Sequence, residues 1–335
     1  MTAQTVLVTG ATTGIGLATA RQLLETEHRL ILTARASSLP RFHAHGIVES
    51  ERVKLRALDV TSDEDRRRVV AEADAEWGGV DVLINNAGVS YRSVVEHVRR
   101  QERWTQMGIN FRAPMQLIQL VLPGMRRKRA GRIITISSVG GMMAMPTMGV
   151  YSASKWALEG AHEALWYEVR PWNIRVTLVQ PGFIRSDGFQ NVKYTIDSDR
   201  SEADQCEIYH NHYSCMVPFI EKMMTRAKAT SESVARVVLK TMNRRKPPLR
   251  VAGTRDAWAF SMLRRVLPRN LYHWVLYRSL PKIGEWGKTP EGMAEDPGPC
   301  PMPYGPGAVR RAEEAGMPLP TPAPQTAPSR EAAES

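Results

Sequence analysis

The chain has 335 residues, of which 43% are hydrophobic and 24% charged, and its formal net charge is +11. This composition suffices for one large α/β domain or two smaller ones. Three cysteines are too few for a disulfide framework, and no run reaches the roughly 18 apolar residues of a membrane-spanning helix. The positive charge suits an acidic ligand, a membrane surface or nucleic acid.

The amino terminus shows no pattern of a signal peptide, because a strand-like run, Val6-Leu7-Val8, begins almost at once. The cysteines, at positions 206, 215 and 300, fit a reducing compartment. We therefore expect a cytoplasmic protein.

The first motif is a glycine-rich turn between a strand and a helix. Residues 5–9 (T-V-L-V-T) read as a buried parallel strand, and residues 17–24 continue with helical periodicity. The turn between them is G-A-T-T-G-I-G, spaced G-x-x-x-G-x-G rather than G-x-G-x-x-G. Small residues and free N–H groups at a helix start can bind a pyrophosphate. The candidate cofactor-binding residues here are Gly10, Thr12, Thr13, Gly14, Ile15 and Gly16.

The end of the second strand bears on the choice of dinucleotide. This strand covers residues 29–34 and is followed by Arg35. An acidic residue at its end would bind the ribose hydroxyls of NAD, whereas Ala34 stands there and Arg35 can pair with a phosphate. The pattern favours NADP(H). NAD(H) stays open, because Arg35 can be a merely solvated charge and the turn offers Thr13 where a second cation would strengthen the case.

Two further strand ends carry cofactor candidates. A strand at residues 53–58 precedes Asp59 and Val60, and a helix is expected at about 62–77. Asp59 can accept from an adenine amino group, or can equally be a helix-capping loop residue. The strand at residues 80–84 leads into N-N-A-G, where small residues permit close approach to a flat ring and the asparagines can tie strands together. The candidates there are Asn86, Ala87 and Gly88.

The catalytic candidates lie between residues 137 and 160. A strand at residues 132–136 delivers Ser138, and Tyr151 and Lys155 follow at a spacing of four, which places them on one helix face. The lysine together with a cationic cofactor ring is expected to lower the pKa of the phenol, which would exchange a proton with an oxygen held by Ser138. By itself Tyr-x-x-x-Lys also occurs by chance in many helices.

Together these motifs resemble the short-chain dehydrogenase/reductase family. T-G-A-T-T-G-I-G, Asp59-Val60, N-N-A-G, Asn110, Ser137-Ser138, Tyr151-x-x-x-Lys155 and Pro181-Gly182 occur in its order and spacing over roughly residues 4–190. The resemblance implies a doubly wound Rossmann-type parallel sheet of about seven strands, NAD(P) binding and a homo-oligomer. It also implies a catalytic set of Asn110, Ser138, Tyr151 and Lys155, with Asn110 anchoring a water that links Lys155 to solvent.

The resemblance extends to the turn after the sixth strand, residues 174–179. It implies that this turn meets the nicotinamide carboxamide, with Ser186 standing where the family has threonine. The residues that it assigns to the cofactor here are Pro181, Gly182, Ile184 and Ser186.

The wording around Tyr151 is similar to that of the estradiol-type 17β-hydroxysteroid and retinol dehydrogenases, which implies a bulky lipophilic alcohol or ketone. Four methionines, at positions 142, 143, 145 and 148, lie between Ser138 and Tyr151. Flexible thioethers suit an adaptable apolar wall, and core packing is an equal alternative. The candidate substrate contacts are Ser138, Met142, Met145 and Tyr151.

We expect a single catalytic domain over residues 1–255, with a substrate lid at about 187–230. A helix at about 111–125 ends in four cations, for which a nucleic-acid patch is a minor alternative. The lid contains C-x3-H-x-H-x2-C, but this spacing matches no usual zinc site, so no metal is expected. A helix at 231–242 and a short seventh strand at 250–252 complete the domain.

After this domain we expect a basic amphipathic helical extension over residues 256–285 and a disordered Pro-rich tail over 286–335. Residues 257–280 mix arginines with Trp, Tyr and aliphatic residues, interrupted by Pro268. They can contact a membrane interface peripherally, cover the substrate entrance or pack on a second subunit.

The sequence therefore predicts an NADP-dependent oxidoreductase that interconverts an alcohol and a ketone or aldehyde on a steroid-, retinoid- or fatty-chain-like substrate. The alternative is a non-catalytic NADP(H)-sensing regulator or scaffold. The intact Ser–Tyr–Lys set argues against this alternative. A nucleic-acid partner is not favoured, because it would require the cationic clusters of the sequence to share one face.

Overall fold

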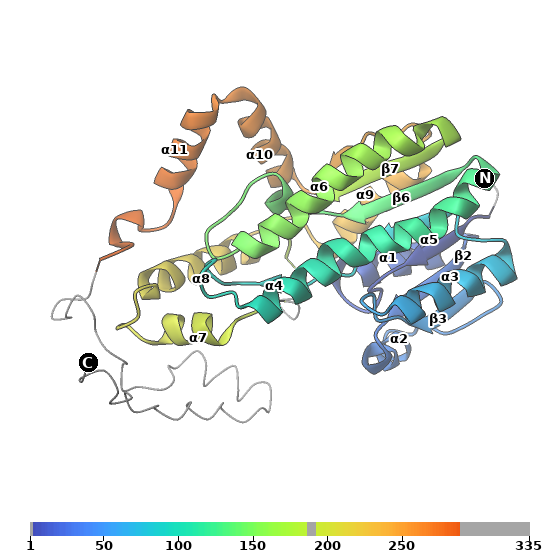
Figure 1. Cartoon of the computed structure of the whole chain (residues 1–335), viewed down its shortest axis with the longest axis horizontal. Helices are drawn as coiled ribbons and strands as arrows, with labels where there is room; N and C mark the ends of the chain where they lie inside the picture. Colours follow the sequence, from blue (N-terminus) through green and yellow to red (C-terminus); the bar gives the residue numbers. More distant parts are fainter. Residues whose placement is uncertain (1–2, 186–191, 289–335) are drawn as a thin grey trace, which may run out of the picture.

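The computed structural model describes residues 3–185 and 192–288. At its centre is a seven-stranded sheet in the order β3-β2-β1-β4-β6-β7-β9, and every pairing in it is parallel (Figure 1). The strands are β1 (Thr5–Val8), β2 (Arg29–Ala34), β3 (Val53–Ala57), β4 (Val82–Asn85), β6 (Gly131–Ile136), β7 (Ile174–Gln180) and β9 (Arg250–Ala252). This sheet confirms the predicted doubly wound fold.

The strand order reverses at the middle of the sheet. From β1 the chain builds outward to β2 and β3, and then crosses back to β4 on the other side of β1. Val8 lies beside Leu32 on one side and beside Ile84 on the other. In sheets of this kind, ligands bind outside the carboxyl ends of the strands at such a reversal.

Helices cover both faces of the sheet, and a group of them lies beyond its carboxyl edge. Helices α1 and α9 pack together on one face, and α3, α5 and α6 cover the other (Figure 1). The helices are α1 (Gly14–Leu24), α2 (Pro40–Ala44), α3 (Asp63–Trp77), α4 (Arg100–Met107), α5 (Ala113–Lys128), α6 (Gly149–Val169), α7 (Ile196–Ala203), α8 (His210–Thr225), α9 (Ser231–Asn243), α10 (Arg255–Val266) and α11 (Arg269–Ser279). A short parallel pair joins β5 (Ser90–Tyr91) to β8 (Val192–Lys193).

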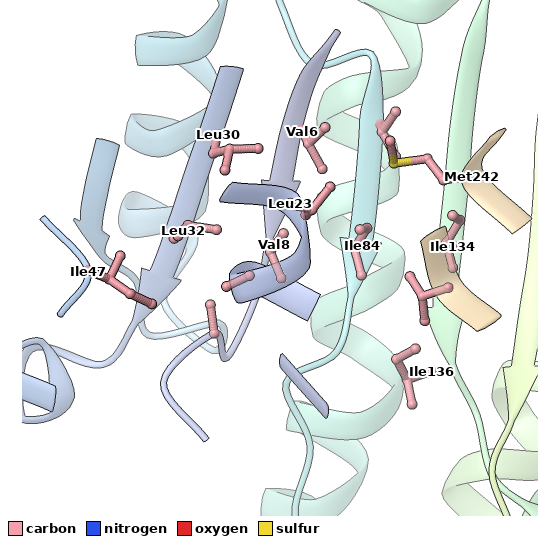
Figure 2. Packing of buried hydrophobic residues seen from close by; sticks show 14 of the residues in the cluster. Val6, Val8, Leu23, Leu30, Leu32, Ile47, Ile84, Ile134, Ile136 and Met242 are labelled. Atoms are coloured by element: carbon pink, nitrogen blue, oxygen red, sulfur yellow. The ribbon is translucent and has the colours of Figure 1, made fainter. Parts of the chain in front are cut away.

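The two faces bury separate hydrophobic cores because successive strand residues point to opposite sides. Val6 and Val8 of β1 pack with Leu23 of α1 in one core, while Leu7 of β1 lies in the other. Figure 2 shows the first core, with Leu23 and Met242 of the covering helices directed at the strands. Each fully buried side chain of this size contributes about 1.5–3 kcal/mol. The side chains on both faces of the central strands are therefore buried against the covering helices.

The region predicted as a lid contains helices that the sequence pattern did not reveal. Helix α7 begins with a capping box between Thr195 and Ser198, and α8 contains an internal proline, Pro218. Part of the lid, residues 186–191, lies outside the described residues. The described part contains the short strand β8 followed by helices α7 and α8.

Three of the four cations at the end of α5 have structural partners. Arg126 lies over the ring of Trp172, and the Lys128 amine pairs with Asp81 at 2.6 Å. A guanidinium N–H of Arg129 donates to the carbonyl oxygen of Pro171 at 3.2 Å. These contacts account for three of the four charges without a nucleic acid.

The carboxyl-terminal extension forms two helices that join at Leu267-Pro268. Tyr272 of α11 is buried with Val139 and Met143, and Phe260 and Leu263 of α10 pack around them. Among the residues that the structure describes, no helix is long and apolar enough to cross a membrane. The predicted Pro-rich tail lies outside the described residues from position 289 onward.

The buried face of β4 provides a test of the packing. Leu83 has no exposed surface, whereas Val48 is a largely exposed aliphatic residue. We expect Leu83→Ala to lower the free energy of unfolding by about 2–5 kcal/mol, because it leaves a cavity. Val48→Ala, the control, should change it by less than about 0.5 kcal/mol. Urea titration followed by circular dichroism measures both; equal stability of the two variants would contradict the assigned core.

Candidate active site

Hydrogen bonds join the glycine turn between β1 and α1 to the loop that follows β4. The side-chain amide of Asn86 donates to the carbonyl oxygens of Thr9 and Gly10, each at 3.0 Å. The Thr9 hydroxyl in turn accepts from the backbone N–H groups of Asn86 and Ala87 at 2.9 and 3.0 Å. Asn86, a predicted cofactor contact, therefore supports the turn with its amide nitrogen.

Glycine is required in this turn for two separate reasons. Gly10 and Gly14 have φ angles of +67° and +53°, in the left-handed region that favours glycine. A Cβ on Gly16 would collide with the carbonyl oxygen of Gly10 and the amide of Asn86. Beyond the turn, the first N–H groups of α1 have no partner within the helix. This geometry suits a bound pyrophosphate.

Arg35 and Asp59 follow the carboxyl ends of the neighbouring strands β2 and β3. Arg35 is exposed, while Ala34 before it is buried at the end of β2. One carboxylate oxygen of Asp59 accepts from the backbone N–H and the hydroxyl of Thr61, at 2.9 and 2.7 Å. Asp59 thus has the loop-stabilising role that the sequence left open. Val60 packs against the second core.

Tyr151 and Lys155 lie on α6 and approach each other as their spacing predicted. The Lys155 amine is 5.8 Å from the centre of the Tyr151 ring and donates to the carbonyl oxygen of Ile136 at 2.9 Å. A Cβ placed on Gly88 would lie 4.0 Å from the same amine. The N-N-A-G loop and the Tyr–Lys pair therefore meet at one place.

Ser138 lies beside Tyr151 at the end of β6. Its hydroxyl accepts from the backbone N–H of Gly140 at 3.0 Å, and a Cβ on Gly140 would lie 3.1 Å from the Tyr151 ring. Burial raises the pKa of Tyr151, and its hydrogen bond with Ser138 acts in the opposite direction. Burial lowers the pKa of Lys155 to about 8, and the charge of Glu159 opposes this fall.

The predicted fall of the Tyr151 pKa invoked Lys155 together with the cofactor ring, and the protein's own groups alone do not produce it. The lysine amine was expected to help lower the pKa of this phenol, but with the protein's own groups the pKa is raised. Lys155 donates to Ile136 and is itself harder to charge because it is buried, so desolvation of the phenol outweighs it. Among the protein's groups, Ser138 is the one that favours the phenolate.

Asn110 belongs to a π-helical turn, Gly108–Arg112, between α4 and α5. Its side-chain amide donates to the carbonyl oxygen of Val89 at 2.8 Å and to the Ser154 hydroxyl at 3.0 Å, and its side-chain oxygen accepts from the N–H of Val89 at 2.9 Å. The Ser154 hydroxyl donates to the carbonyl oxygen of Tyr151 at 2.7 Å. Asn110 thereby ties the loop after β4 to the turn of α6 that carries Tyr151.

A second buried chain of hydrogen bonds joins the same elements. The amide of Asn85 lies 3.3 Å from the hydroxyl of Thr135, which is 2.7 Å from Nε2 of His162. Nδ1 of His162 is 2.9 Å from the carbonyl oxygen of Leu158, so Nδ1 carries the proton. Burial lowers the pKa of His162 to about 4, which keeps this ring neutral.

The turn after β7 is anchored by the start of α10. The backbone N–H of Gly182 donates to the Thr254 hydroxyl at 2.9 Å, and that of Phe183 donates to Asp256 at 2.8 Å. A Cβ on Gly182 would collide with the Asp256 carboxylate. Pro181 and Ile184 are among the described residues of this turn, whereas Ser186 lies outside them.

Ser154, Thr254 and Asp256 were not singled out from the sequence. Ser154 directly precedes Lys155, and this position was the one feature of the sequence that could have indicated its role. Thr254 and Asp256 acquire their roles through partners more than 70 positions away, which no local pattern indicates.

The methionine-rich segment lies under the carboxyl-terminal helices. Met142 and Met145 are half-buried and pack in the cluster formed by Val139, Met143 and Tyr272. They therefore contribute to packing, one of the two roles predicted, and keep part of their surface exposed.

Aromatic packing in the predicted lid involves His212, and Tyr213 of the lid packs against a histidine of an earlier segment. His97 is stacked on Tyr213, and His212 lies 4.6 Å from the ring of Trp286, centre to centre. Nδ1 of His210 is 3.1 Å from the carbonyl oxygen of Ser201. Among the described residues, no group of three or more His, Cys, Asp or Glu side chains is arranged to hold a metal ion.

The chain is similar in sequence to proteins of one family. Residues 4–197 match the short chain dehydrogenase family. A 3-ketodihydrosphingosine reductase of Bacteroides thetaiotaomicron is 35% identical over 278 residues, which cover 82% of this chain and 97% of that protein. Human retinol dehydrogenase 8 is 30% identical over 74% of this chain and 80% of its own length.

Solved structures show the same similarity. A short-chain dehydrogenase from Streptomyces avermitilis has a TM-score of 0.70 and 28% identity, covering 83% of this chain and 98% of the other. A metagenomic short-chain oxidoreductase in complex with NADP has a TM-score of 0.55 and 25% identity, covering 74% and 96%. The chain therefore belongs to the short-chain dehydrogenase/reductase family and is an oxidoreductase that acts on alcohol or carbonyl groups.

Proposed function

We propose that this chain is an NADP(H)-dependent oxidoreductase that interconverts an alcohol and a ketone or aldehyde on a lipophilic substrate. The observation that carries the proposal is the meeting of Ser138, Tyr151 and Lys155 with the N-N-A-G loop at the carboxyl edge of the sheet. The rival, a non-catalytic NADP(H) sensor, has no need of this arrangement.

The glycine turn and the end of β2 fit a phosphorylated dinucleotide. Gly10 and Gly14 supply the left-handed backbone conformations, and the start of α1 supplies N–H donors. Exposed Arg35 can pair with a 2′-phosphate, and the buried side chain of Ala34 offers the ribose hydroxyls no acceptor. The NADP complex of the metagenomic relative supports this assignment. NAD(H) is the second candidate.

The glycine turn and Arg35 would hold NADPH, which would serve as the hydride source for reduction of a carbonyl group. The Ser138 hydroxyl donates a hydrogen bond to the carbonyl oxygen and orients it. Tyr151 donates the proton to that oxygen, a role that suits a phenol whose pKa is raised by burial. Ser138 favours the resulting phenolate through its hydrogen bond, and Lys155, whose amine lies 5.8 Å from the centre of the ring, adds its charge when it is protonated. Asn110 keeps the turn of α6 in place.

The substrate class is inferred from the wall of the site and from the relatives. Met142 and Met145 keep part of their surface exposed beside the apolar residues of α10 and α11. Flexible thioethers adapt to bulky apolar molecules. The names of the sphingosine-type reductase and of retinol dehydrogenase 8 point to long-chain or retinoid substrates for those proteins, which supports a lipophilic substrate here.

We further infer that the paired helices α10 and α11 contact an anionic lipid surface peripherally. Residues 255–279 carry five arginines against a single acid, Asp256, which is engaged with Phe183. Trp258 and Trp274 are 60% and 58% exposed on these helices. Aromatic and basic side chains together suit a membrane interface. The opposite side of the same helices packs on the methionine segment, which would bring a lipophilic substrate to the site.

The proton donor is the first test. Tyr151→Phe removes the phenolic hydroxyl and leaves Ser138 and Lys155, so we expect NADPH binding to persist and kcat to fall at least about a hundredfold. Tyr167→Phe, an exposed position on the same helix, is the control. The measurements are NADPH fluorescence for binding and NADPH consumption with steroid ketones, retinal and long-chain ketones. Turnover of the Tyr151 variant near the wild-type rate would refute the mechanism.

The choice of dinucleotide is tested at the end of β2. Arg35→Asp exchanges a cation for an anion beside the 2′-phosphate, so the ratio of kcat/KM for NADPH to that for NADH should fall by about tenfold to a hundredfold. Arg41→Asp makes the same charge change at an exposed position on α2. That control should leave the ratio in place. The assignment fails if the two variants behave alike.

Lipid contact is tested by sedimentation with vesicles of phosphatidylcholine, with and without phosphatidylserine. We expect the wild type to bind the anionic vesicles, with weaker binding at high salt, and Trp258→Ala with Trp274→Ala to reduce the bound fraction several-fold. Trp104→Ala, at a 67% exposed site on α4, is the control. Light scattering reports whether copies of the chain associate, as the resemblance predicts. If the double variant separates copies without affecting vesicle binding, the face belongs to a subunit interface instead.

A further inference from the structure

A buried carboxylate lies one helical turn beyond Lys155. Glu159 follows Lys155 by four positions on α6, and its side chain is 9% exposed. One oxygen accepts from the Ser137 hydroxyl at 2.5 Å and from the Gln180 amide at 3.0 Å. The other accepts from Nε of Arg250 at 2.7 Å. Both oxygens of this carboxylate are thus engaged by donors.

These donors come from three adjacent strands. Ser137 follows β6 and precedes Ser138, Gln180 ends β7 and precedes the Pro181-Gly182 turn, and Arg250 begins β9. Gly141 also fits closely here, because a Cβ on it would lie 2.9 Å from the Ser137 hydroxyl and 3.0 Å from Cγ of Glu159. One side chain of α6 therefore sets the position of the segments that carry the catalytic serine and the proposed cofactor turn.

The surroundings of Glu159 contain a limited set of charges. Arg250 also pairs with Glu163 at 2.7 Å, so it bridges two carboxylates of α6. Arg264 of α10 lines the same cavity of about 360 Å³ as Glu159, Glu163 and Arg250. Towards the active site, the charged neighbour is Lys155, with Tyr151 and neutral His162 on the same helix.

We propose that Glu159 is a positioning residue of the active site, which supplies the counter-charge for Lys155 and aligns the ends of β6 and β7 with α6. The proposal rests on the proposed function, since it gives Lys155 a catalytic role. The carboxylate touches neither the reacting atoms nor Tyr151; it acts through Lys155, Ser137 and Gln180.

The charge and the alignment can be separated by substitution. Glu159→Gln keeps the shape but removes the negative charge, so charged Lys155 loses its opposing partner and should give up its proton at lower pH. Arg250→Gln has the opposite effect, because the Glu159 charge is then no longer shared with the guanidinium. A purely structural role would affect stability without moving the titration of Lys155 in opposite directions.

The titration of Lys155 is measured by NMR of protein labelled with ¹³C at lysine Cε, with the signal assigned by Lys155→Arg. In Glu159→Gln the midpoint should move down by about one pH unit, and in Arg250→Gln it should move up. Glu163→Gln, which removes the more exposed partner of Arg250, is the matched control and should leave the midpoint nearest to that of the wild type. An unchanged midpoint in a folded Glu159→Gln protein, with its melting temperature checked, overturns the proposal.

Two further results decide the remaining cases. If Glu159→Gln does not fold, the test rests on Arg250→Gln alone. An unchanged or lower midpoint of the Lys155 titration in Arg250→Gln would then refute the proposal that Glu159 is the counter-charge of Lys155. With a substrate from the NADPH panel, the alkaline limb of kcat/KM should move to lower pH in Glu159→Gln and return in Glu159→Asp. Shifted midpoints in a protein that turns over no substrate would support the counter-charge and refute the proposed function.

Discussion

The parallel alignment of β1, β4, β6 and β7 is the constraint on which the site depends. Because these strands run in one direction, the glycine turn, the N-N-A-G loop, Ser138 and the Pro181-Gly182 turn all emerge at one edge of the sheet. Short side-chain bonds then set their spacing: Thr9 and Asn86 join the first two, and Glu159 joins the last two. The sheet brings these segments to one edge, and the buried polar side chains fix the distances between them.

Lys155 carries the electrostatic cost of this arrangement. The fall of its pKa from 10.5 to about 8 corresponds to about 3 kcal/mol against the charged form. This figure is what remains after the Glu159 carboxylate has opposed the desolvation, and the Lys155 amine also donates to the carbonyl oxygen of Ile136. A lysine with a pKa of about 8 releases its proton more readily than a fully solvated amine with a pKa of 10.5.

The parts of the molecule that could be predicted are those encoded by local spacing. The glycine turn, the strand-end loops and the Tyr151–Lys155 pair each show within a few residues, because strand and helix periods determine what lies together. The position of Arg35 directly after β2 could be predicted for the same reason. The fold class followed from the alternation of short apolar strands with helices, with ends displaced by a few residues, as at α5. Asn110 was reached only through the family resemblance, since a polar residue at a π-helical turn has no local signature.

Other features depend on partners far apart in the chain. Glu159 looks like an ordinary helix residue until Gln180 and Arg250 reach it, and Asp256 becomes an anchor only because Phe183 folds back to it. Helices α7 and α8 escaped prediction because one is short and polar and the other contains Pro218. The spacing also does not give the pKa of Tyr151 in the protein alone, because burial raises this pKa and burial is a property of the assembled protein.

The carboxyl-terminal helices have two structural roles: they anchor the turn after β7 and they pack on the methionine segment. Their start anchors the Pro181-Gly182 turn through Thr254 and Asp256, and their inner side closes over the methionine segment. Any shift of α10 relative to the sheet must therefore strain both the turn after β7 and the apolar wall, since the two contacts share one helix. A movement of α10 would reach the turn after β7 directly, because the backbone N–H groups of that turn donate to the side chains of Thr254 and Asp256 at 2.9 and 2.8 Å. The position of α10 and the geometry of the turn after β7 are therefore coupled.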